Sequence, residues 1–411
     1  MRVRIQNGQV ADVTLSIFEP PRFFEAFLRG RHYTEAPDIT ARICGICPVA
    51  YQISAVNALE SLLGVEPSGQ LRALRRLLYC GEWIASHGLH IHMLHAPDFY
   101  GYSSALEMAK QHRDVVERGL QLKKVGNAIM STLAGREIHP INVRVGGFYS
   151  VPSKASLQAL APSLRWARDA AEQTVRWAAA LPFPELERDY VFVALRHPHE
   201  YPMSDGRLVS SSGLDSPVQQ YQHHFASTHA ATSTALRGRL ADGRAPLMGP
   251  LARYNLNFDR LPDHLQDLAH AVGLGARCRN PFKSIVVRSM EVLLAVQEAL
   301  RIVEAYSPPS TAALPAPAKP GEGHGASEAP RGTLYHRYCL DAEGNITDAT
   351  ITPPTAQNQP VIEEDLYELV AANMDADDAT LQWHCEQAIR NYDPCISCAT
   401  HFLRVQVERE P

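Results

Sequence analysis

The sequence predicts a mainly α-helical fold of the α+β class, in which small β-sheets lie beside a bundle of long helices. The chain has 411 residues, of which 45% are hydrophobic, so it can bury a large core. Much of its first half repeats apolar residues with helical spacing, whereas its strand-like segments are short. A helical bundle buries several long apolar helix faces together. No repeat period is visible, and we expect one domain over residues 1–411.

Residues 1–41 are expected to form a strand and helix region. The segment "VRIQNGQVADVTLSIF" contains Asn7-Gly8, a dipeptide typical of the tight turn between two antiparallel strands. The first residues lack the apolar stretch of a secretory signal, and charges interrupt the longest apolar runs well before the roughly 18 residues that a membrane span needs. We therefore expect a cytoplasmic chain without a membrane span or an export signal of its own.

Residues 42–306 are expected to form the helical core. The segment "SAVNALESLLG" places Val56, Leu59, Leu62 and Leu63 on one stripe and ends at Gly64, a suitable C-terminal cap. Three further segments have long helical patterns: "LRALRRLLYCGEWIASHGLHIHMLH", "LEMAKQHRDVVERGLQLKKVGNAIMSTLAG" and "LRWARDAAEQTVRWAAAL". One strand, "DYVFVAL", is predicted within this region.

Four histidines lie close together at the end of the helical segment "LRALRRLLYCGEWIASHGLHIHMLH". His-x-x-His spacing can place two ligands on one helix face, but on an unbroken helix His87 and His90 face differently from His92. We expect His87, His90, His92 and His95 to be hydrogen-bonded core residues. His87 and His90 are also candidates for orienting metal ligands or carrying protons.

The last quarter of the chain begins with a change of composition. Residues 307–332, "SPPSTAALPAPAKPGEGHGASEAPRG", are predicted to form a loop because they are rich in proline, glycine and alanine. Within this segment "GEGHGA" matches a loose nucleotide-binding pattern, but no strand is expected before it, so the match carries no function. Residues 333–401 should contain the strand pair "TLYHRYCLDAEGNITDATI", and residues 402–411 form a tail.

The charge balance excludes nucleic acid as a partner. The chain has 39 basic and 44 acidic residues, a formal net charge of −5, and no sustained basic run. A protein that binds nucleic acid needs a basic patch or stripe to match the phosphate backbone.

Four of the eight cysteines form two pairs with identical spacing, Cys44 with Cys47 and Cys395 with Cys398. Such pairs in a long chain indicate metal binding in a reducing compartment rather than a disulfide scaffold. The first pair lies at a helix entrance, and the second follows Asp393-Pro394, where proline fixes a turn. A buried site with four thiolates is expected. The spacing alone leaves structural zinc, an iron-sulfur cluster, and nickel or iron as alternatives.

Beyond this spacing, "RICGIC" near the N-terminus and "DPCISCATH" near the C-terminus resemble the two signature motifs of the large, catalytic subunit of nickel-iron hydrogenases. Five further segments resemble that family in the same order: "SHGLHIHMLHAPDF", "AGREIHPINVRVGG", "MGPLARYNLN", "EAPRGTLYH" and "PPTAQN". The segment "FEPPRFFEAFLRGRHYTEAPDITARICGICPVAYQ" is most similar to the soluble, bidirectional, nicotinamide-coupled branch, which includes the sulfhydrogenases.

The resemblance implies reversible heterolytic oxidation of dihydrogen by a catalytic subunit of an oligomeric oxidoreductase. Electrons would pass to an iron-sulfur small subunit and on to NAD(P) through nicotinamide and flavin reductase subunits. The four remaining cysteines stand singly, so they offer no motif for an iron-sulfur cluster of the chain's own. A regulatory dihydrogen sensor and a structural zinc-binding scaffold remain as alternative functions.

The resemblance also assigns ligands to the matching positions. Cys44 and Cys395 would be terminal ligands of nickel, while Cys47 and Cys398 would bridge nickel to an iron that carries carbon monoxide and cyanide. Cys395 would also accept the proton released from dihydrogen. Soft thiolates suit nickel and low-spin iron.

Four residues match the family's cover over the two metals: Asp98, Pro330, Arg331 and Asp393. An arginine at this place can polarise dihydrogen through its charge and planar donors without being deprotonated. Apart from the resemblance, Arg331 would be interpreted as a residue that orders a loop through hydrogen bonds.

Glu25 and His401 match the family's ligands of a structural magnesium ion. Magnesium requires an octahedral shell rich in oxygen, so water and a backbone carbonyl would complete it. Apart from the resemblance, Glu25 would be interpreted as a solvated helix residue.

The sequence differs from the family pattern in two places. Tyr51 stands where a histidine usually follows the first cysteine pair, which replaces an imidazole by a phenol with a pKa near ~10. The family's N-terminal Arg-x-Glu-Gly segment, whose glutamate receives protons, has no counterpart in this chain. The tail after His401 resembles one that a maturation protease removes once nickel-insertion proteins have loaded the metal.

Overall fold

The structure is a computed structural model that describes residues 1–7, 9–17, 21–229, 236–394 and 405–410, with the side chains of residues 409 and 410 left aside. Its order of elements matches the predicted class, because long helices dominate and all the sheets are small. None of the described helices is long and apolar enough to cross a membrane.

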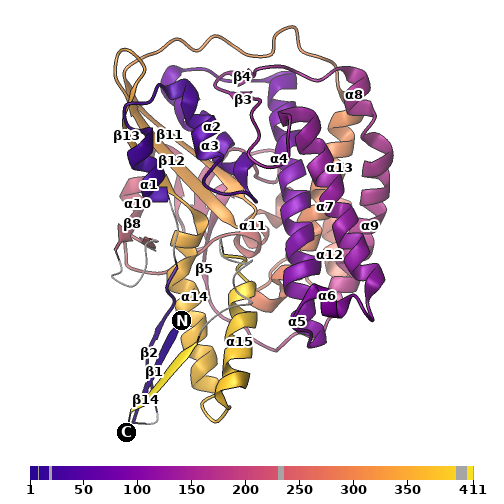
Figure 1. Cartoon of the computed structure of the whole chain (residues 1–411), viewed down its shortest axis with the longest axis vertical. Coiled ribbons are helices and arrows are strands. Elements are labelled where there is room, and N and C mark those ends of the chain that lie inside the picture. The colour runs from indigo at the N-terminus through magenta and orange to yellow at the C-terminus, as the bar shows by residue number, and fades with distance from the viewer. Residues whose placement is uncertain (8, 18–20, 230–235, 395–404, 411) are drawn as a thin grey trace.

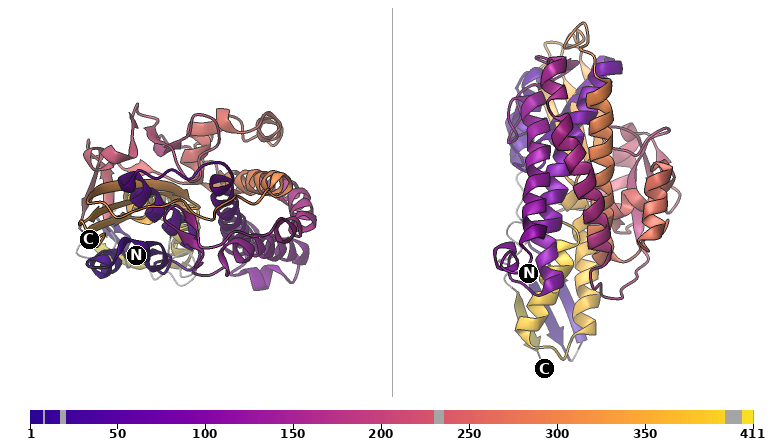
Figure 2. Two further views of the ribbon diagram at one scale, coloured as in Figure 1. Left: turned by 90° about the horizontal axis from the view of Figure 1, so that it is seen from above. Right: turned by 90° about the vertical axis from the view of Figure 1, so that its right-hand side faces the viewer.

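Four long helices lie side by side and form the bundle on one side of the molecule (Figure 1). They are α4 (Gly69–Leu89), α7 (Arg113–Ala134), α9 (Ala161–Ala179) and α13 (Ser284–Ala305). Helices α4 and α7 approach closely where Gly81 faces Gly126, since a Cβ atom on Gly126 would lie 2.5 Å from the carbonyl oxygen of Gly81. Figure 2 shows the bundle along its full length. The sequence predicted α4, α7 and α9 from their apolar periodicity.

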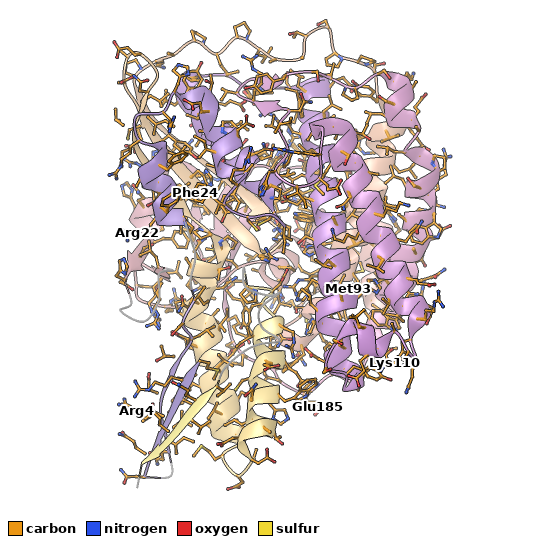
Figure 3. The ribbon with its side chains drawn as sticks, viewed as in Figure 1. Arg4, Arg22, Phe24, Met93, Lys110 and Glu185 are labelled. Atoms are coloured by element: carbon orange, nitrogen blue, oxygen red, sulfur yellow. The ribbon has the colours of Figure 1, made fainter. Side chains whose placement is uncertain are left out.

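Helix α4 continues into a π-helical segment, His90–His95, and then into α5 (Ala96–Tyr100). Short α6 (Ala105–Met108) follows before α7. Met93 in the π-helical segment and Lys110 after α6 mark this end of the bundle in Figure 3. A π-helical turn changes which residues share a face, so the directions expected for these histidines on a regular α-helix do not apply beyond Leu89.

A three-stranded antiparallel sheet lies beside the bundle, formed by β11 (Gly321–Ala329), β12 (Gly332–Leu340) and β13 (Ile346–Thr352). Helix α3 (Pro48–Leu63) packs directly on β11 and β12, and α1 (Pro21–Leu28) packs on β13. As predicted, α3 ends at Gly64, which has a φ of 72°.

The expected loop over residues 307–332 is therefore wrong in its second half. Residues 307–320 form a connection in which only isolated bridge residues pair, but β11 occupies 321–329. The glycines of β11 let α3 lie against the strand. A Cβ atom on Gly323 would lie 2.1 Å from the carbonyl oxygen of Ala58 on α3, and a Cβ atom on Gly325 would lie 2.3 Å from the backbone nitrogen of Ala58. The glycines of "GEGHGA" thus serve packing, which agrees with setting the nucleotide motif aside.

Smaller sheets interrupt the region that the sequence assigned to a helical core. The predicted strand "DYVFVAL" is β5 (Val191–Arg196), which lies in a four-stranded sheet with β6, β7 and β10. The remaining elements of this region are β3 (Val143–Arg144), β4 (Gly147–Phe148), α8 (Lys154–Gln158), β6 (Arg207–Ser210), β7 (Asp215–Ser216), α10 (Tyr221–His224), β8 (Phe225–Thr228), β9 (Arg237–Leu240), β10 (Pro246–Leu247), α11 (Pro250–Asn257) and α12 (Asp263–Ala271). Four single 3₁₀ turns occur at Tyr33–Glu35, Val218–Gln220, Phe258–Arg260 and Pro281–Lys283.

Both ends of the chain meet in one sheet, seen at the lower end of Figure 1. Strands β1 (Arg2–Gln6) and β2 (Gln9–Thr14) form the predicted hairpin, with Asn7 at a φ of 51°. Strand β14 (Gln406–Glu410) pairs in parallel with β1, and Arg2 Nη2 lies 2.6 Å from Glu408 Oε2. Helices α14 (Pro354–Ala372) and α15 (Asp378–Arg390) connect the β11–β13 sheet to the second cysteine pair, and α14 packs on β2.

Candidate metal centre

The first cysteine pair lies in the loop between α2 (Ala36–Thr40) and α3. Both side chains are buried, with exposed fractions of 7% for Cys44 and 6% for Cys47. Cys47 occupies the N-cap position of α3, and Pro48 begins the helix, where a missing N–H costs nothing. The predicted helix entrance is confirmed, and the positive end of the helix dipole at this place favours the thiolate form.

Glu82 on α4 caps the N-terminus of the neighbouring helix α3. Cys47 makes no side-chain capping hydrogen bond, and the amides of Val49 and Ala50 instead donate to the Glu82 carboxylate at 2.6 and 3.1 Å. Burial raises the pKa of Glu82 well above its usual range, although these two amides act in the opposite direction. The sequence analysis missed this residue. Its one signal was an acidic residue inside the apolar helix pattern "YCGEWIAS".

Arg331 reaches the first cysteine pair from the tip of the β11–β12 hairpin. Its Nη1 atom lies 3.7 Å from Cys47 Sγ and 3.9 Å from Cys44 Sγ. Its Nε atom lies 3.2 Å from Asp393 Oδ2, and both side chains are almost fully buried. The structure thus brings Arg331, Asp393, Cys44 and Cys47 together, four of the residues that the sequence analysis selected.

Asp393 has an unusual backbone conformation, with a φ of 49°. Residues other than glycine rarely adopt this region, and a following proline favours extended backbone instead. A conformation of this kind costs of order 1–3 kcal/mol and persists where the surroundings impose it. Cys395 follows two residues later in the sequence. Cys395, Cys398 and His401 lie outside the described residues.

Several elements hold the backbone just before this point. Arg390 donates two hydrogen bonds of 2.7 Å to the carboxylate of Asp98, and both residues are buried. The carbonyl oxygen of Asn391 accepts hydrogen bonds from Ser284 Oγ at 2.9 Å and from Arg288 Nη1 at 3.0 Å. Asp98, a candidate for the cover over the metals, therefore forms its ion pair with Arg390.

The four histidines are fully or almost fully buried, as the sequence analysis expected for core residues. The π-helical segment turns His90 and His95 toward the same stretch of chain. His90 Nε2 lies 2.9 Å from the carbonyl oxygen of Arg390, and His95 Nε2 lies 3.0 Å from Asn391 Oδ1. Burial lowers the pKa of all four, and that of His92 falls to about 3. These side chains are therefore neutral at physiological pH.

Tyr51 lies on α3 with its ring 5.8 Å from the ring of His336 on β12. His336 Nδ1 lies 2.8 Å from the hydroxyl oxygen of Tyr338, and burial lowers the pKa of His336 to about 3. An imidazole is thus present beside the position where the sequence substitutes tyrosine for histidine. Sequence reasoning missed His336 because it is far from the cysteine pair in the chain.

Glu25 lies on α1 beside the β11–β13 sheet, with its Oε1 atom accepting the amide of Ile351 at 2.7 Å. Burial raises its pKa, so it differs from the solvated residue that its sequence context suggested. Among the described residues, the group with the spacing of a metal site is His197, Glu200 and Asp205, and it does not include Glu25. Arg72 contacts both carboxylates of that group, so a side-chain cation already compensates part of their charge.

The two buried thiols are close enough together to share a metal ion. The neighbouring Cys44 and burial raise the pKa of Cys47 well above its usual range, while Arg331 lowers it. Keeping both thiols deprotonated would require more positive charge than one guanidinium provides, and a bound metal ion would supply it. Thiolate donors suit several transition metals, with zinc and iron-sulfur clusters among them.

Comparisons with known proteins point in the same direction. A family model described as nickel-dependent hydrogenase matches residues 22–119 and 276–401. Sulfhydrogenase 1 subunit alpha of Pyrococcus furiosus is 32% identical over 98% of this chain and 95% of its own length. The NAD-reducing hydrogenase HoxS subunit beta of Cupriavidus necator is 26% identical over 97% of this chain and 91% of its own. A crystal structure of an NAD⁺-reducing [NiFe]-hydrogenase in the H₂-reduced state superposes with a TM-score of 0.85 at 25% identity, covering 96% of this chain and 94% of that one.

Proposed function

The chain belongs to the nickel-dependent hydrogenase family, and from that premise we propose which residues hold the metals and handle the proton. It is a catalytic hydrogenase subunit, an oxidoreductase that acts on dihydrogen. The resemblance inferred from the sequence motifs and the expectation of nickel are thereby confirmed.

The metals are held by four thiolates, Cys44 and Cys47 together with Cys395 and Cys398. The observation that carries this assignment is the ion pair between Arg331 and Asp393. Arg331 contacts both sulfurs of the first pair, and Asp393 precedes Cys395 by two residues. In this assignment the thiolates of Cys44, Cys47, Cys395 and Cys398 would together hold nickel and an iron that carries carbon monoxide and cyanide.

When bound, the two metals supply the Lewis-acid and redox chemistry that separates dihydrogen into protons and electrons. The protein contributes the surroundings. Arg331 directs a permanently charged, planar group with fixed donors at the reaction site, where it polarises the substrate. The Cys395 thiolate accepts the released proton. Asp393 fixes Arg331, and Pro330 shapes the turn that presents it.

Burial is also part of the proposed mechanism. Cys44, Cys47, Arg331 and Asp393 are at most 7% exposed, so water has little access to the charges among them. Electrostatic interactions in such a site are stronger than in water. The neutral histidines near Arg390 and Asn391 keep the approach to the second cysteine pair in place without adding charge.

A magnesium site at Glu25 and His401 remains part of the proposal. One oxygen of Glu25 accepts the Ile351 amide, which fixes the orientation of the carboxylate at the β11–β13 sheet. Magnesium would take the carboxylate, the imidazole of His401, a backbone carbonyl and water.

We also propose an iron-sulfur partner subunit. The cysteines outside the two pairs lie on different elements or loops: Cys80 on α4, Cys278 before the Pro281–Lys283 turn, Cys339 on β12 and Cys385 on α15. No three described cysteines come together, so electrons must leave through another chain. Relatives named as NAD-reducing support a complex that passes electrons on to NAD(P). We propose that nicotinamide and flavin reductase subunits complete this complex and that it lies in the cytoplasm.

Maturation would involve nickel-insertion proteins and a protease that removes the tail after His401. The described part of that tail forms β14, which pairs with β1 at the far end of the molecule from the β3–β4 turn (Figure 1). Cleavage would therefore have to release this strand from the N-terminal hairpin.

The test is metal analysis of the purified complex, combined with dihydrogen oxidation using an artificial electron acceptor and an infrared spectrum. We expect one nickel per chain, acceptor reduction that depends on dihydrogen, and the stretching bands of cyanide and carbon monoxide. Zinc in place of nickel, with no acceptor reduction, would contradict the assignment. Nickel without the infrared bands would contradict the iron ligands alone.

A further inference from the structure

We infer that Arg253, on α11, is a positioning residue that sets the guanidinium of Arg331 against the two sulfurs. The inference rests on the proposed role of Arg331. Arg253 belongs to the segment "MGPLARYNLN" but received no role from the sequence. Its side chain is fully buried, and it lies against the backbone of the turn that carries Arg331.

The residues of that turn do not favour the regular conformations of a two-residue hairpin. Ala329 pairs with Gly332, so Pro330 and Arg331 are the two residues at the tip of the β11–β12 hairpin. The turns that suit a two-residue hairpin require a positive φ at their first central residue. Proline fixes φ near −65°, and Arg331 is not among the described residues with a positive φ. The hairpin must therefore take its geometry from its surroundings.

Arg253 supplies much of that support. Its Nη1 atom donates to the carbonyl oxygen of Ala329 at 2.8 Å, and its Nη2 atom donates to that of Pro330 at 3.1 Å. The next carbonyl oxygen, on Arg331 itself, lies 3.4 Å from Asn358 Nδ2. Consecutive carbonyl groups of the turn are thus bound by side chains from α11 and α14.

Arg253 is itself held rigidly. Nε and Nη2 form a two-pronged ion pair with Glu291 on α13 at 2.8 and 2.7 Å, and Nη1 lies 3.0 Å from Glu328 Oε2. The guanidinium carbon lies 4.5 Å from the centre of the Trp83 ring. A lysine carries the same charge but lacks the planar fork, so it cannot bind both carboxylates and both carbonyl groups at once.

Gly249 completes the support from the other side. A Cβ atom at this position would lie 2.7 Å from the carbonyl oxygen of Arg331. The start of α11 thus lies directly on the turn, and Arg253 follows one helical turn later. Because the contacts from Arg331 to the two sulfurs are 3.7 and 3.9 Å, a small displacement of the turn changes what the guanidinium can polarise.

The experiment is a double-mutant cycle between R253K and R331K in the purified complex. The readouts are the rate of dihydrogen oxidation, the nickel content and the amide hydrogen exchange of residues 329–334. In the wild-type background we expect R253K to lower the rate about 10–100-fold, with nickel retained and faster exchange in the turn. In the R331K background we expect R253K to lower the remaining rate less than about twofold, since its effect passes through Arg331.

The matched control is R75K. Arg75 is also a buried arginine with a two-pronged ion pair, to Glu60 at 2.7 and 2.6 Å, but it contacts neither the turn nor the cysteines in the described structure. We expect R75K to change the rate by the same small factor in both backgrounds. If R253K does not fold, E291Q loosens Arg253 from α13 without touching the turn and replaces it in the cycle.

The inference is overturned if R253K leaves the rate unchanged. It is equally overturned if R253K lowers the rate by the same factor in both backgrounds, because Arg253 would then act only on the fold. A wild-type complex without nickel or dihydrogen oxidation would instead overturn the proposed function, so the two failures are distinguishable.

Discussion

Two buried arginine–aspartate pairs meet the same short stretch of chain, and they differ in geometry. Arg390 binds Asp98 through two hydrogen bonds of 2.7 Å. Arg331 binds Asp393 at 3.2 and 3.4 Å and lies within 3.9 Å of two sulfurs. All four of these charged residues are at most 6% exposed. Residue type and burial therefore do not distinguish the pairs, whereas distance and neighbours do.

The difference separates a structural ion pair from a group that acts on a ligand. Short, parallel hydrogen bonds satisfy both partners of the Arg390–Asp98 pair and fix the backbone before the second cysteine pair. The longer contacts of Arg331 are shared between a carboxylate and the two thiols proposed to bind the metals. We expect lesions in the first pair to reduce stability and lesions near the second to reduce metal binding or catalysis.

The largest effect is expected from Cys47→Ala, which removes a proposed metal ligand next to Arg331. Nickel content should fall to background and dihydrogen oxidation should be abolished, because the remaining thiolates cannot complete the site. Metal analysis of the purified variant measures this. Cys80→Ala is the control, since Cys80 is a buried thiol on α4 outside the candidate site and should leave nickel unchanged. Full nickel content in the Cys47 variant would show that the region around Arg331 does not bind the metal, and it would then not differ in function from the region around Arg390 and Asp98.

Asp98→Asn should reduce the free energy of unfolding by about 3–5 kcal/mol, because it leaves the buried Arg390 without its charge partner. Denaturant unfolding of wild type and variant measures the difference. The matched control is Asp242→Asn, which alters an exposed aspartate that binds Arg244 through two nitrogens, at 2.9 and 2.5 Å. The control should cause no measurable change. Equal destabilisation in both variants would show that burial of the pair is not what matters.

Arg331→Lys should lower the rate of dihydrogen oxidation about 10²–10³-fold, equivalent to about 2.7–4 kcal/mol, while nickel content and stability stay close to wild type. Lysine keeps the charge but loses the planar donors that reach Asp393 and both sulfurs together. Steady-state kinetics and thermal unfolding of the same preparation separate the two effects. A variant with full activity and reduced stability would place Arg331 in the same structural class as Arg390.

The smallest effect concerns pH and the π-helical segment behind the Arg390–Asp98 pair. Burial lowers the pKa of His92 from 6.5 to about 3 in the folded state. As the pH falls, the imidazole of His92 takes up a proton in the unfolded chain before it does so in the folded protein. The contribution of neutral His92 to the free energy of unfolding is therefore present above pH 6.5 and is lost as the pH falls toward 3. Its slope is about 1.4 kcal/mol per pH unit. Denaturant unfolding between pH 7 and 4 measures this, and His92→Gln should give a shallower dependence. If wild type and the His92→Gln variant show the same dependence of stability on pH, His92 becomes protonated in the folded protein as readily as in the unfolded chain.

Several features could be predicted from the sequence because neighbouring residues decide them. Asn7-Gly8 marks the β1–β2 turn, and Gly64 ends α3 with the positive φ that glycine accepts. Apolar periodicity located α4, α7 and α9. The cysteine pair at a helix entrance follows from the sequence of helical residues after Cys47. The two cysteine motifs together identified the family before any geometry was known.

Other features depended on contacts between distant segments. Glycines in residues 321–326 indicated a loop, yet they form β11 because α3 must approach the strand closely. Glu82 caps a helix to which it does not belong, and no local sequence pattern predicts such a cap. The π-helical segment brings His90 and His95 to one side, which an unbroken helix would not do.

By itself the sequence determined the family and the local turns and helices, and it selected the thiols proposed to bind the metals, because each depends on residue type and short spacing. Only the tertiary structure decided that Arg331 reaches the first sulfurs, that Asp98 binds Arg390, and that Arg253 supports the turn. The physical reason is that buried charges take the partner that the packing of distant elements brings within hydrogen-bonding distance. That distance is a property of the assembled chain.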